Sequence, residues 1–547
     1  MSATEETYSI ACQGGLDTTT NTQELLQKPG WATRLVNFES SNDGGYRRIS
    51  GYIPLGSNKT PGSEVTKIKG IKIINNESFL ICHEDKVYFS YDAVNFVNIA
   101  RVMDLTPSTG VDLNGMDYTK LQVSAEIPRA SSYHYDFQIF RQGTNILIMG
   151  VSEGHKPFYF KVSGTTLENS TYRYEELSLT TGTMSGATIS EKHKDQWVIA
   201  GMDQAPAEIY YSDILKPYDF EGANAGSIGF NDTVMGAQMF REDLIVFCRN
   251  SIHKVSGLSS GSPQRVTITT KIGCVDGNSI QELAGDLVFL SPDGLRTLSA
   301  TARIGDVNLA ALSDSIANRL RIINVDIDKF DVRSETLKNK VQYRLFFKPK
   351  PGEKLGSYAI SMHMRVDPQS GSLVPEFSEL TGFDILAIDN GFYLGRERTV
   401  SGDSLGKIWF HDEGIDFNGK YINFMYETPF FSITDPAVRK NIHKITTYLK
   451  IEGDTDFNIA LKFDHDAKDT YQPAPYPVGT LVAPAIYGTT KYKTNNSKYG
   501  TEKNPVINTL TEGSGKTMAI RIFPSGKRCD PFSLQGFDIN FIQAGRI

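Results

Sequence analysis

Short apolar runs separated by polar turn formers recur along the chain, and the stretch from Lys67 to Ile99 shows the pattern most clearly. Its three runs alternate apolar and polar residues and are separated by Asn75-Asn76 and by His83-Glu84-Asp85. Because alternation with a period of two, bounded by turn residues, is typical of strands, we predict three antiparallel strands here. The end of the third run, Ser90-Tyr91-Asp92, is echoed at Tyr211-Ser212-Asp213, which indicates that one structural unit recurs.

Further strand triplets restart at intervals between 44 residues (235 to 279) and 68 residues (67 to 135). Their starts lie near Tyr135, Thr188, Met235, Ser279, Phe330 and Phe383. One four-stranded propeller blade occupies ~40 to 50 residues, so these intervals fit blades with loop insertions. We therefore predict an all-β chain in which residues 67–429 form a β-propeller of six or seven blades.

The two ends of the chain depart from this repeat. Residues 1–66 are broken by pairs such as Gly14-Gly15 and Pro29-Gly30, which predicts an extended N-terminal arm with a few short strands and one short helix over Asp17 to Gln27. Residues 430–547 contain two pairs of long apolar runs around an irregular insertion, and this pattern predicts a C-terminal β-sandwich. The insertion, residues 469–504, is rich in Pro, Tyr, Gly and Asn, so we expect it to become ordered only against a partner.

One segment has helical periodicity instead. From Leu309 to Ile323 the apolar residues recur at spacings of three and four, and Asn308 stands where a helix cap would be. The residues on this face are Leu309, Leu312, Ile316, Leu320 and Ile323. We expect the longest helix of the chain here, packed on a blade as an insertion, and the alternative is a contact element between subunits.

Composition narrows the class of protein. The formal net charge is −7, from 56 Lys plus Arg and 63 Asp plus Glu, and no dense basic tract occurs. The electrostatic pattern of a dedicated nucleic-acid binder is therefore missing. The first residues are polar and acidic and no run approaches the ~18 apolar residues of a membrane span, so we predict neither a signal peptide nor a membrane anchor.

The five cysteines are widely spaced and odd in number, whereas metal sites and disulfide frameworks use closely spaced pairs. We predict reduced thiols and a reducing place of synthesis, with Cys82 and Cys248 inside apolar strands. The nine histidines are scattered as well, and no two stand in the i, i+4 arrangement of a metal site on a helix.

Three short motifs resemble phosphate-binding or catalytic motifs but lack the flanking strands and helices that those motifs need. Gly513-Ser514-Gly515-Lys516-Thr517 has no Gly five residues before its Gly-Lys pair and is followed by a predicted strand, so we interpret it as a hairpin turn and not as a phosphate-binding loop. Gly257 to Gly261 and Gly402 to Gly406 match the nucleophile-elbow pattern, which needs a strand before it and a helix after it. Predicted strands follow both, and we interpret both as turns.

Acidic clusters give no clear site either. Asp326, Asp328 and Asp331, and likewise Asp464, Asp466 and Asp469, lack the central Gly and closing Glu of a calcium loop, so solvated turns are favoured. The turn from Ser90 to Phe96 resembles the Asp-containing turn of sialidase-like propellers, in which the Asp caps its own backbone. We therefore predict no catalytic, cofactor-binding or metal-binding residues, and not an enzyme.

The segment from Leu35 to Tyr52 resembles the opening of the tail nozzle proteins of short-tailed bacteriophages, also called packaged-DNA stabilisation or tail tubular proteins. The matching residues are Leu35-Val36-Asn37-Phe38-Glu39 and Gly44-Gly45-Tyr46-Arg47-Arg48-Ile49-Ser50-Gly51-Tyr52. Tyr426 to Phe431 and Phe537 to Asn540 also resemble segments of that family. The order of arm, blades and C-terminal strands is similar too.

This resemblance implies a structural protein of the virion tail, assembled in the host cytoplasm, with no catalytic residues. It implies a ring, a homohexamer, that sits below the portal and adaptor proteins, meets tail fibres or spikes, and forms the distal nozzle through which the genome leaves. DNA would pass through the lumen without sequence-specific binding. A net acidic chain without basic runs is compatible with such passage.

Two alternatives from different classes remain open. The chain could instead be a receptor-binding or carbohydrate-active tail propeller, which would require an acidic and aromatic pocket on one face and, for hydrolysis, two carboxylates at a set separation. The residues Tyr46, Arg47 and Arg48 could contact DNA, but a buried strand with its salt bridges is the favoured interpretation.

Overall fold

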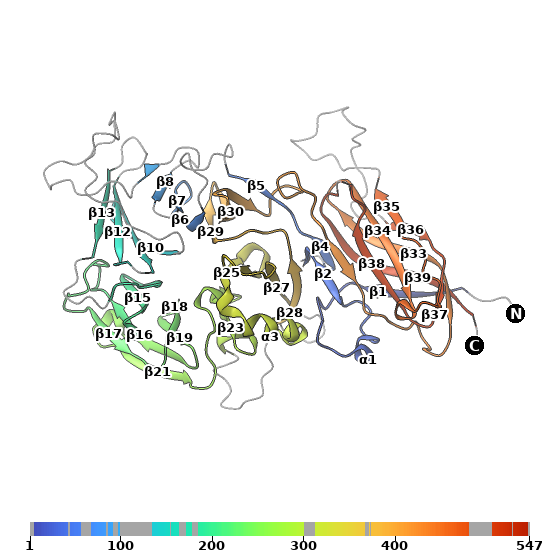
Figure 1. Cartoon of the computed structure of the whole chain (residues 1–547), viewed down its shortest axis with the longest axis horizontal. Helices are drawn as coiled ribbons and strands as arrows, with labels where there is room; N and C mark the ends of the chain where they lie inside the picture. The colour runs from blue at the N-terminus through green and yellow to red at the C-terminus, as the bar shows by residue number, and fades with distance from the viewer. Residues whose placement is uncertain are drawn as a thin grey trace.

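The computed structural model describes residues 5–41, 44–55, 67–83, 86–90, 97–98, 134–153, 155–163, 171–177, 184–299, 312–366, 371, 373–480, 506–527 and 529–544. Almost all regular structure in these residues is β, as predicted. Figure 1 shows many small sheets in one part of the molecule and two large sheets beside them, with both termini at the far end of the large sheets.

Seven small antiparallel sheets follow one another along the chain, and each predicted start of a strand triplet lies within four residues of the first strand of one of them. The first four are β6 (Ile68–Ile73), β7 (Phe79–His83), β8 (Lys86–Ser90) and β9 (Val97–Asn98); β10 (Tyr135–Gln142), β11 (Asn145–Ser152), β12 (Phe158–Ser163) and β13 (Thr171–Glu176); β14 (Ile189–His193), β15 (Gln196–Met202), β16 (Ala205–Tyr211) and β17 (Gly226–Gly229); and β18 (Val234–Phe240), β19 (Asp243–Cys248), β20 (Ile252–Ser256) and β21 (Gln264–Thr269).

The last three are β22 (Gln281–Leu283), β23 (Asp286–Ser291) and β24 (Gly294–Thr297); β25 (Phe330–Leu337), β26 (Gln342–Pro349), β27 (Tyr358–Val366) and β28 (Leu373–Leu380); and β29 (Ala387–Tyr393), β30 (Arg396–Gly402) and β31 (Ile408–His411) with the N-terminal β5 (Tyr52–Pro54). The first strands contact one another in turn: β6 meets β10, β10 meets β14, β14 meets β18, β25 meets β29, and β29 meets β6. The turn Gly277–Ser279 contacts both β18 and β25 and so connects the fourth sheet to the sixth beside β22.

Two larger sheets are built from both ends of the chain. One contains β1 (Glu6–Ala11), β3 (Phe38–Ser40), β4 (Tyr46–Arg48), β33 (Lys440–Ile451), β36 (Val506–Leu510), β37 (Ser514–Gly515) and β39 (Phe532–Gln543). The other contains β2 (Arg34–Val36), β32 (Met425–Glu427), β34 (Thr455–Phe463), β35 (Tyr476–Thr480) and β38 (Met518–Pro524). Aromatic rings pack between these sheets, as the stacked pair Phe457 and Phe532 shows, with ring centroids 5.0 Å apart.

The second large sheet is continuous with the sixth small sheet, because β2 pairs in parallel with β28 at Val36 and Glu379 and antiparallel with β32. One nine-stranded sheet therefore runs from the small sheets into the C-terminal region. The N-terminal residues, predicted as an extended arm, supply strands to both large sheets and to the seventh small sheet. Their helix, α1, is confined to Thr22–Leu25 and is capped by the side chain of Asn21.

The predicted helix over Leu309 to Ile323 is shifted toward the C-terminus. Its predicted start lies outside the described residues, and the helix α3 spans Ala317–Val325 after a short 3-10 turn. The shift has a physical cause: the Ser313 hydroxyl accepts a hydrogen bond from Leu295 N at 2.9 Å, which fixes the preceding chain on β24. Leu320 and Ile323 are buried and α3 contacts β24, so the helix packs on a sheet as predicted.

Candidate functional site

Buried carboxylates connect the first strands of successive small sheets. These first strands are not paired in one ladder, yet their backbone N–H groups need partners when buried. The carboxylates supply them in three contacts: Asp136 Oδ2 accepts from Ser190 N at 3.0 Å, Glu191 Oε1 from Met239 N at 2.9 Å, and Asp389 Oδ2 from Ile73 N at 2.7 Å. In each contact the acceptor and the donor belong to neighbouring sheets. We call the carboxyl groups of Asp136, Glu191, Glu335 and Asp389, together with Lys72 and Arg333 beside them, the central cluster.

Burial determines the charge state of the central cluster. It raises the pKa of Asp136 to about 6 and that of Glu191 to about 8. Burial together with the nearby charge of Asp389 raises the pKa of Glu335, also on a first strand, to about 8. Lys72 lies 2.9 Å from Asp389, and the attraction of that carboxylate raises the lysine pKa. Glu191 and Glu335 are therefore mostly protonated at neutral pH.

The polar atoms of the central cluster are used within the fold. Arg333 donates to the carbonyl oxygens of Leu386 and Val332, both at 3.0 Å. The Glu191 carboxyl also accepts hydrogen bonds from the side-chain amides of Gln138 and Gln238, at 3.3 and 3.2 Å. These contacts describe a packed support and not a substrate site. Among the described residues, no group of three or more His, Cys, Asp or Glu side chains is arranged to hold a metal ion.

A second buried charged group lies where the small sheets meet the large ones. Glu39 of β3 is 4% exposed and contacts Lys340 at 2.9 Å, Arg47 at 2.9 Å and Arg344 at 3.4 Å. Asp412, which follows β31, contacts Arg344 at 2.8 Å and Lys340 at 2.7 Å. We call these five residues the junction network. They connect β3 and β4 to the sixth and seventh small sheets.

The carboxylates of the junction network have pKa shifts opposite to those of Glu191 and Glu335. Burial would raise the pKa of Glu39, but the positive charges of Lys340 and Arg344 outweigh it and lower that pKa. The same competition lowers the pKa of Asp412. Both carboxylates are therefore ionised at neutral pH, and each is held by cations. A buried ion pair that loses one partner leaves an uncompensated charge, which makes this network sensitive to substitution.

Arg48 is 1% exposed and has carbonyl groups as partners instead of a carboxylate. Its guanidinium donates to the carbonyl oxygens of Ile49 at 2.8 Å, Ile415 at 2.9 Å and Cys529 at 2.5 Å. Burial lowers its pKa to about 10. Tyr46 is fully buried and Arg47 pairs with Glu39 and Glu452. The three residues form a strand with Tyr46 and Arg48 buried, as predicted, and the salt bridges of this strand are those of Arg47.

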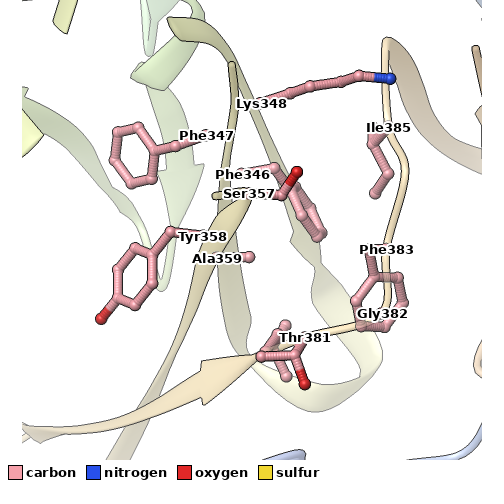
Figure 2. Close-up of a pocket in the computed structure, with 11 residues that line it drawn as sticks. Phe346, Phe347, Lys348, Ser357, Tyr358, Ala359, Thr381, Gly382, Phe383 and Ile385 are labelled. Atoms are coloured by element: carbon pink, nitrogen blue, oxygen red, sulfur yellow. The ribbon is translucent and has the colours of Figure 1, made fainter. Parts of the chain in front are cut away.

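The hollow in Figure 2 is too small to serve as a substrate pocket. It encloses about 20 Å³, room for about one water molecule. Phe346 and Phe383 lie on facing sides, and Lys348 reaches across toward the segment that carries Ile385. The Lys348 ammonium is paired with Asp384. The hollow is lined by Phe346, Phe347, Lys348, Ser357, Tyr358, Ala359, Leu380, Thr381, Gly382, Phe383 and Ile385.

The motif around Lys516 is a bend between strands of the two large sheets, and the predicted hairpin is wrong because β37 pairs with β33 whereas β38 pairs with β32 and β34. Ser514–Gly515 form the short strand β37, and β38 follows, so no helix N-terminus faces a phosphate. The Asp464 carboxylate accepts from the backbone N of Lys516 at 2.8 Å and of Thr517 at 3.1 Å. A carboxylate already occupies the amides that a phosphate would need.

The two nucleophile-elbow patterns are also turns between strands. Gly257 and Gly261 both have positive φ and flank a 3-10 turn that leads into β21. The turn after Gly402 leads into β31 and is built by Asp403, which accepts from Leu405 N, Lys407 N and the indole of Trp409. This Asp caps its own turn in the way expected for the segment from Ser90 to Phe96, most of which lies outside the described residues.

The remaining candidates have structural partners. Asp213 in the echoed phrase accepts from Ile214 N at 2.9 Å and Asn224 N at 3.2 Å. Among the Asp clusters, Asp326 pairs with Lys329, Asp331 with His134 and Asp466 with Lys462. All five cysteines are buried free thiols, and Cys82 and Cys248 lie in strands as predicted. Within the described ranges, every helix is too short or too polar to cross a membrane.

Comparisons with known proteins give no assignment. No family model and no curated protein matches the chain. The extracellular domain of a candidate one-component system from B. thetaiotaomicron has a TM-score of 0.34 at 11% identity, and the match covers 64% of this chain and 39% of that one. An AfRom2 CNH domain has a TM-score of 0.35 at 9% identity, covering 66% and 98%.

An exo-β-1,3-galactanase from Phanerochaete chrysosporium, solved with galactose, has a TM-score of 0.25 at 10% identity, covering 90% of this chain and 100% of that one. The chain thus spans less than half the length of the first of these structures. All three likenesses are too distant to assign a family, a substrate or a partner to the chain.

Proposed function

We propose that the chain is a structural protein of a short-tailed phage virion, the subunit of the distal tail nozzle, and not an enzyme. In this proposal a ring of copies, a homohexamer, closes the channel below the portal and adaptor proteins and conducts the genome during ejection. Tail fibres or spikes attach around it. Assembly takes place in the host cytoplasm, and DNA passes without sequence-specific binding.

The observation that carries the proposal is the place of the segment from Leu35 to Tyr52, whose sequence resembles the opening of tail nozzle proteins. This segment contains Glu39 and Arg48, which bind Lys340 and the carbonyl oxygen of Ile415 in the small-sheet region. A segment with this role fixes the shape of the subunit. The resemblance therefore falls on a segment that joins the two parts of the chain.

The proposal includes a finer description of the fold, a closed propeller of seven blades. The successive contacts of the first strands, which return from β29 to β6, support closure. The pairing of N-terminal β5 with β31 supports it as well, because a strand from one end of the chain then completes the sheet at the other end. A closed propeller is a rigid unit, which suits a subunit that forms the wall of a channel.

The chemistry of the described residues also supports a structural role. The buried carboxylates bind backbone amides or cations of the same chain, and the hollow at Lys348 has room for about one water molecule. Hydrolysis of a glycan would need two carboxylates flanking an open cleft. The net charge of −7 suits a conduit that releases DNA, because tight phosphate binding requires clustered cations.

Two assays with the purified chain test the proposal against its alternative. First, the chain is mixed with portal and adaptor complexes, and we expect it to bind below the adaptor as a ring. Second, host-surface polysaccharide is incubated with the chain, and we expect no release of reducing ends. Cleavage of the polysaccharide without binding to the adaptor would favour the carbohydrate-active propeller instead.

A further inference from the structure

Among the described residues, β1 and β36 are edge strands on opposite sides of the large sheet that contains β33. Across this part of the sheet the order is β1, β39, β33, β36, and every neighbouring pair is antiparallel. Within the described residues β1 pairs only with β39, and β36 pairs only with β33. An exposed strand edge offers a row of N–H and C=O groups to another chain.

The residues of the two edge strands lie in the same rows of paired residues across the sheet. The pairing register places Ser9 opposite Asp538, Asp538 opposite Thr446, and Thr446 opposite Asn508. No register shift interrupts β33 between Lys444 and Tyr448. Residues 7–11 of β1 and residues 506–510 of β36 therefore occupy the same five rows, and Ser9 shares a row with Asn508.

The free backbone groups of the two edges also match. In an antiparallel ladder, residues alternate between bonding the neighbouring strand and pointing away from it. Thr511 N donates to His443 O, so Asn508 and Leu510 of β36 point their backbone groups to the free edge. Cys12 N donates to Gln535 O, so Thr7 and Ser9 of β1 do the same. The free groups of both edges thus lie in the same rows.

We propose that β36 of one copy pairs antiparallel with β1 of the next copy, head to tail, with Asn508 opposite Ser9. From one free edge to the other the sheet has four strands, an even number. A further copy added in the same orientation therefore continues the antiparallel order of the strands. It also continues the alternation of hydrogen-bonded and non-bonded residue pairs. A head-to-tail contact closes into a ring when the rotation between copies closes, and the pairing of Asn508 with Ser9 adds no step along the strands that would oppose closure. The contact also covers Leu510, which is 79% exposed.

This inference rests on the proposed ring and adds the surface that builds it. The register can be tested by joining two strands of different copies with a disulfide. Facing Cα atoms in a bonded antiparallel pair are ~5.5 Å apart, within the range that a disulfide spans. The five native thiols are buried, so introduced surface cysteines dominate oxidation.

The test variant carries Ser9→Cys and Asn508→Cys in the full chain, and the matched control carries Thr7→Cys and Val506→Cys on the same two strands, four residues out of register. Under mild oxidation we expect the test variant to give a ladder of covalent oligomers on a non-reducing gel, at least tenfold more than the control gives. Equal crosslinking of the two variants, or none in either, would overturn the proposed pairing.

A second substitution tests the hydrogen bonds themselves. Asn508→Pro removes an N–H that points to the free edge and leaves the ladder to β33 intact, whereas Asn508→Thr keeps the N–H. We expect the Pro variant to need at least a tenfold higher concentration to form oligomers in sedimentation, and the Thr variant to behave like the parent chain. Rings of the Pro variant at the concentration of the parent chain would contradict the pairing.

The outcomes separate this inference from the proposed function. Rings that form without the disulfide ladder would disprove the β36 to β1 contact and leave the nozzle proposal standing. Crosslinked oligomers in the expected register that fail to bind a portal and adaptor complex would support the contact and count against the nozzle.

Discussion

Glu191 in the central cluster and Asp412 in the junction network are both buried carboxyls, but their partners give them opposite charge states. Glu191 in the central cluster accepts hydrogen bonds from amides, and burial raises its pKa to about 8. Asp412 in the junction network is held by Arg344 and Lys340, and its pKa is lowered. The difference shows that the partner, and not the depth of burial, decides whether a buried carboxyl is neutral or ionised.

Each solution suits its place in the molecule. At the centre, the neutral Glu191 carboxyl supplies a hydrogen-bond acceptor to a strand of the neighbouring sheet, whereas Asp389, which does the same, is paired with Lys72. At the junction, ion pairs connect segments from distant parts of the chain, and such pairs depend on every partner being present. The two regions should therefore respond differently to substitution and to pH.

The largest expected effect is the loss of Arg344. Arg344→Met keeps much of the side-chain volume but leaves Glu39 and Asp412 with less positive charge, so we expect a loss of about 3 to 5 kcal/mol in the free energy of unfolding. The control is Arg396→Met, which removes an exposed partner of Glu413 and should cost below about 1 kcal/mol. Denaturant titration measures both, and equal costs would contradict the role of the network.

Arg48→Met should have the next largest effect. It leaves the carbonyl oxygens of Ile415 and Cys529 buried without their donor, and we expect a cost of about 2 to 3 kcal/mol. Arg48→Lys retains a donor and should recover part of the loss in the same titration. If the Lys variant were as unstable as the Met variant, hydrogen bonding to these carbonyls would not explain why Arg48 is buried.

The two regions should also differ in how their contribution to the free energy of unfolding depends on pH, and this effect is smaller. A carboxyl whose pKa is raised on folding contributes stability that is complete below its unfolded pKa, near 4.5, and is lost as the pH rises through about 8. Glu191→Gln should therefore reduce the loss of stability between pH 7 and pH 9 by about 1 kcal/mol. The exposed Glu282→Gln is the control and should leave the pH profile unchanged.

The stability that the junction network contributes depends on pH with the opposite sign. Because the pKa of Asp412 is lowered on folding, its contribution is present above the unfolded pKa, near 3.8, and is lost as the pH falls through the lower folded value. Thermal unfolding of the parent chain should therefore show an alkaline loss that Glu191→Gln reduces and an acid loss that it does not change. If Glu191→Gln also reduced the loss of stability at acid pH, the raised pKa would belong to a group other than Glu191.

The smallest effect concerns the turn that imitates a phosphate-binding loop. Lys516 is exposed and its backbone N is bonded to Asp464, so Lys516→Ala should change stability by below about 0.5 kcal/mol. Neither the parent chain nor the variant should gain thermal stability from Mg-ATP. A gain in the parent chain that the variant lacks would revive nucleotide binding at this turn.

Local patterns in the sequence predicted much of the fold. Alternating runs and turn formers located the starts of the small sheets, and the motifs at Lys516 and Ser259 were recognised as connections between strands because strands follow them. The helix boundary was wrong because Ser313 bonds β24 across the fold, a contact that periodicity does not contain.

The two charged regions could not have been found in the same way. Glu39 and Arg344 are 305 residues apart, and their pairing depends on how β3 meets the sixth sheet. Asp136 and Glu191 carry a weak signal, since each is an acidic residue on the first strand of a unit, where apolar residues are otherwise expected. The turn at Asp403 carries a clearer signal in the order Ser401, Asp403 and Trp409.

Electron microscopy of the purified full chain tests the central claim most directly. If the chain is the subunit of a nozzle, particles should include closed rings of identical copies with a central channel, and averaging should show one repeated unit of small and large sheets around an axis. A population that remains monomeric at concentrations where phage tail proteins would assemble, with polysaccharide cleavage in the same preparation, would contradict it.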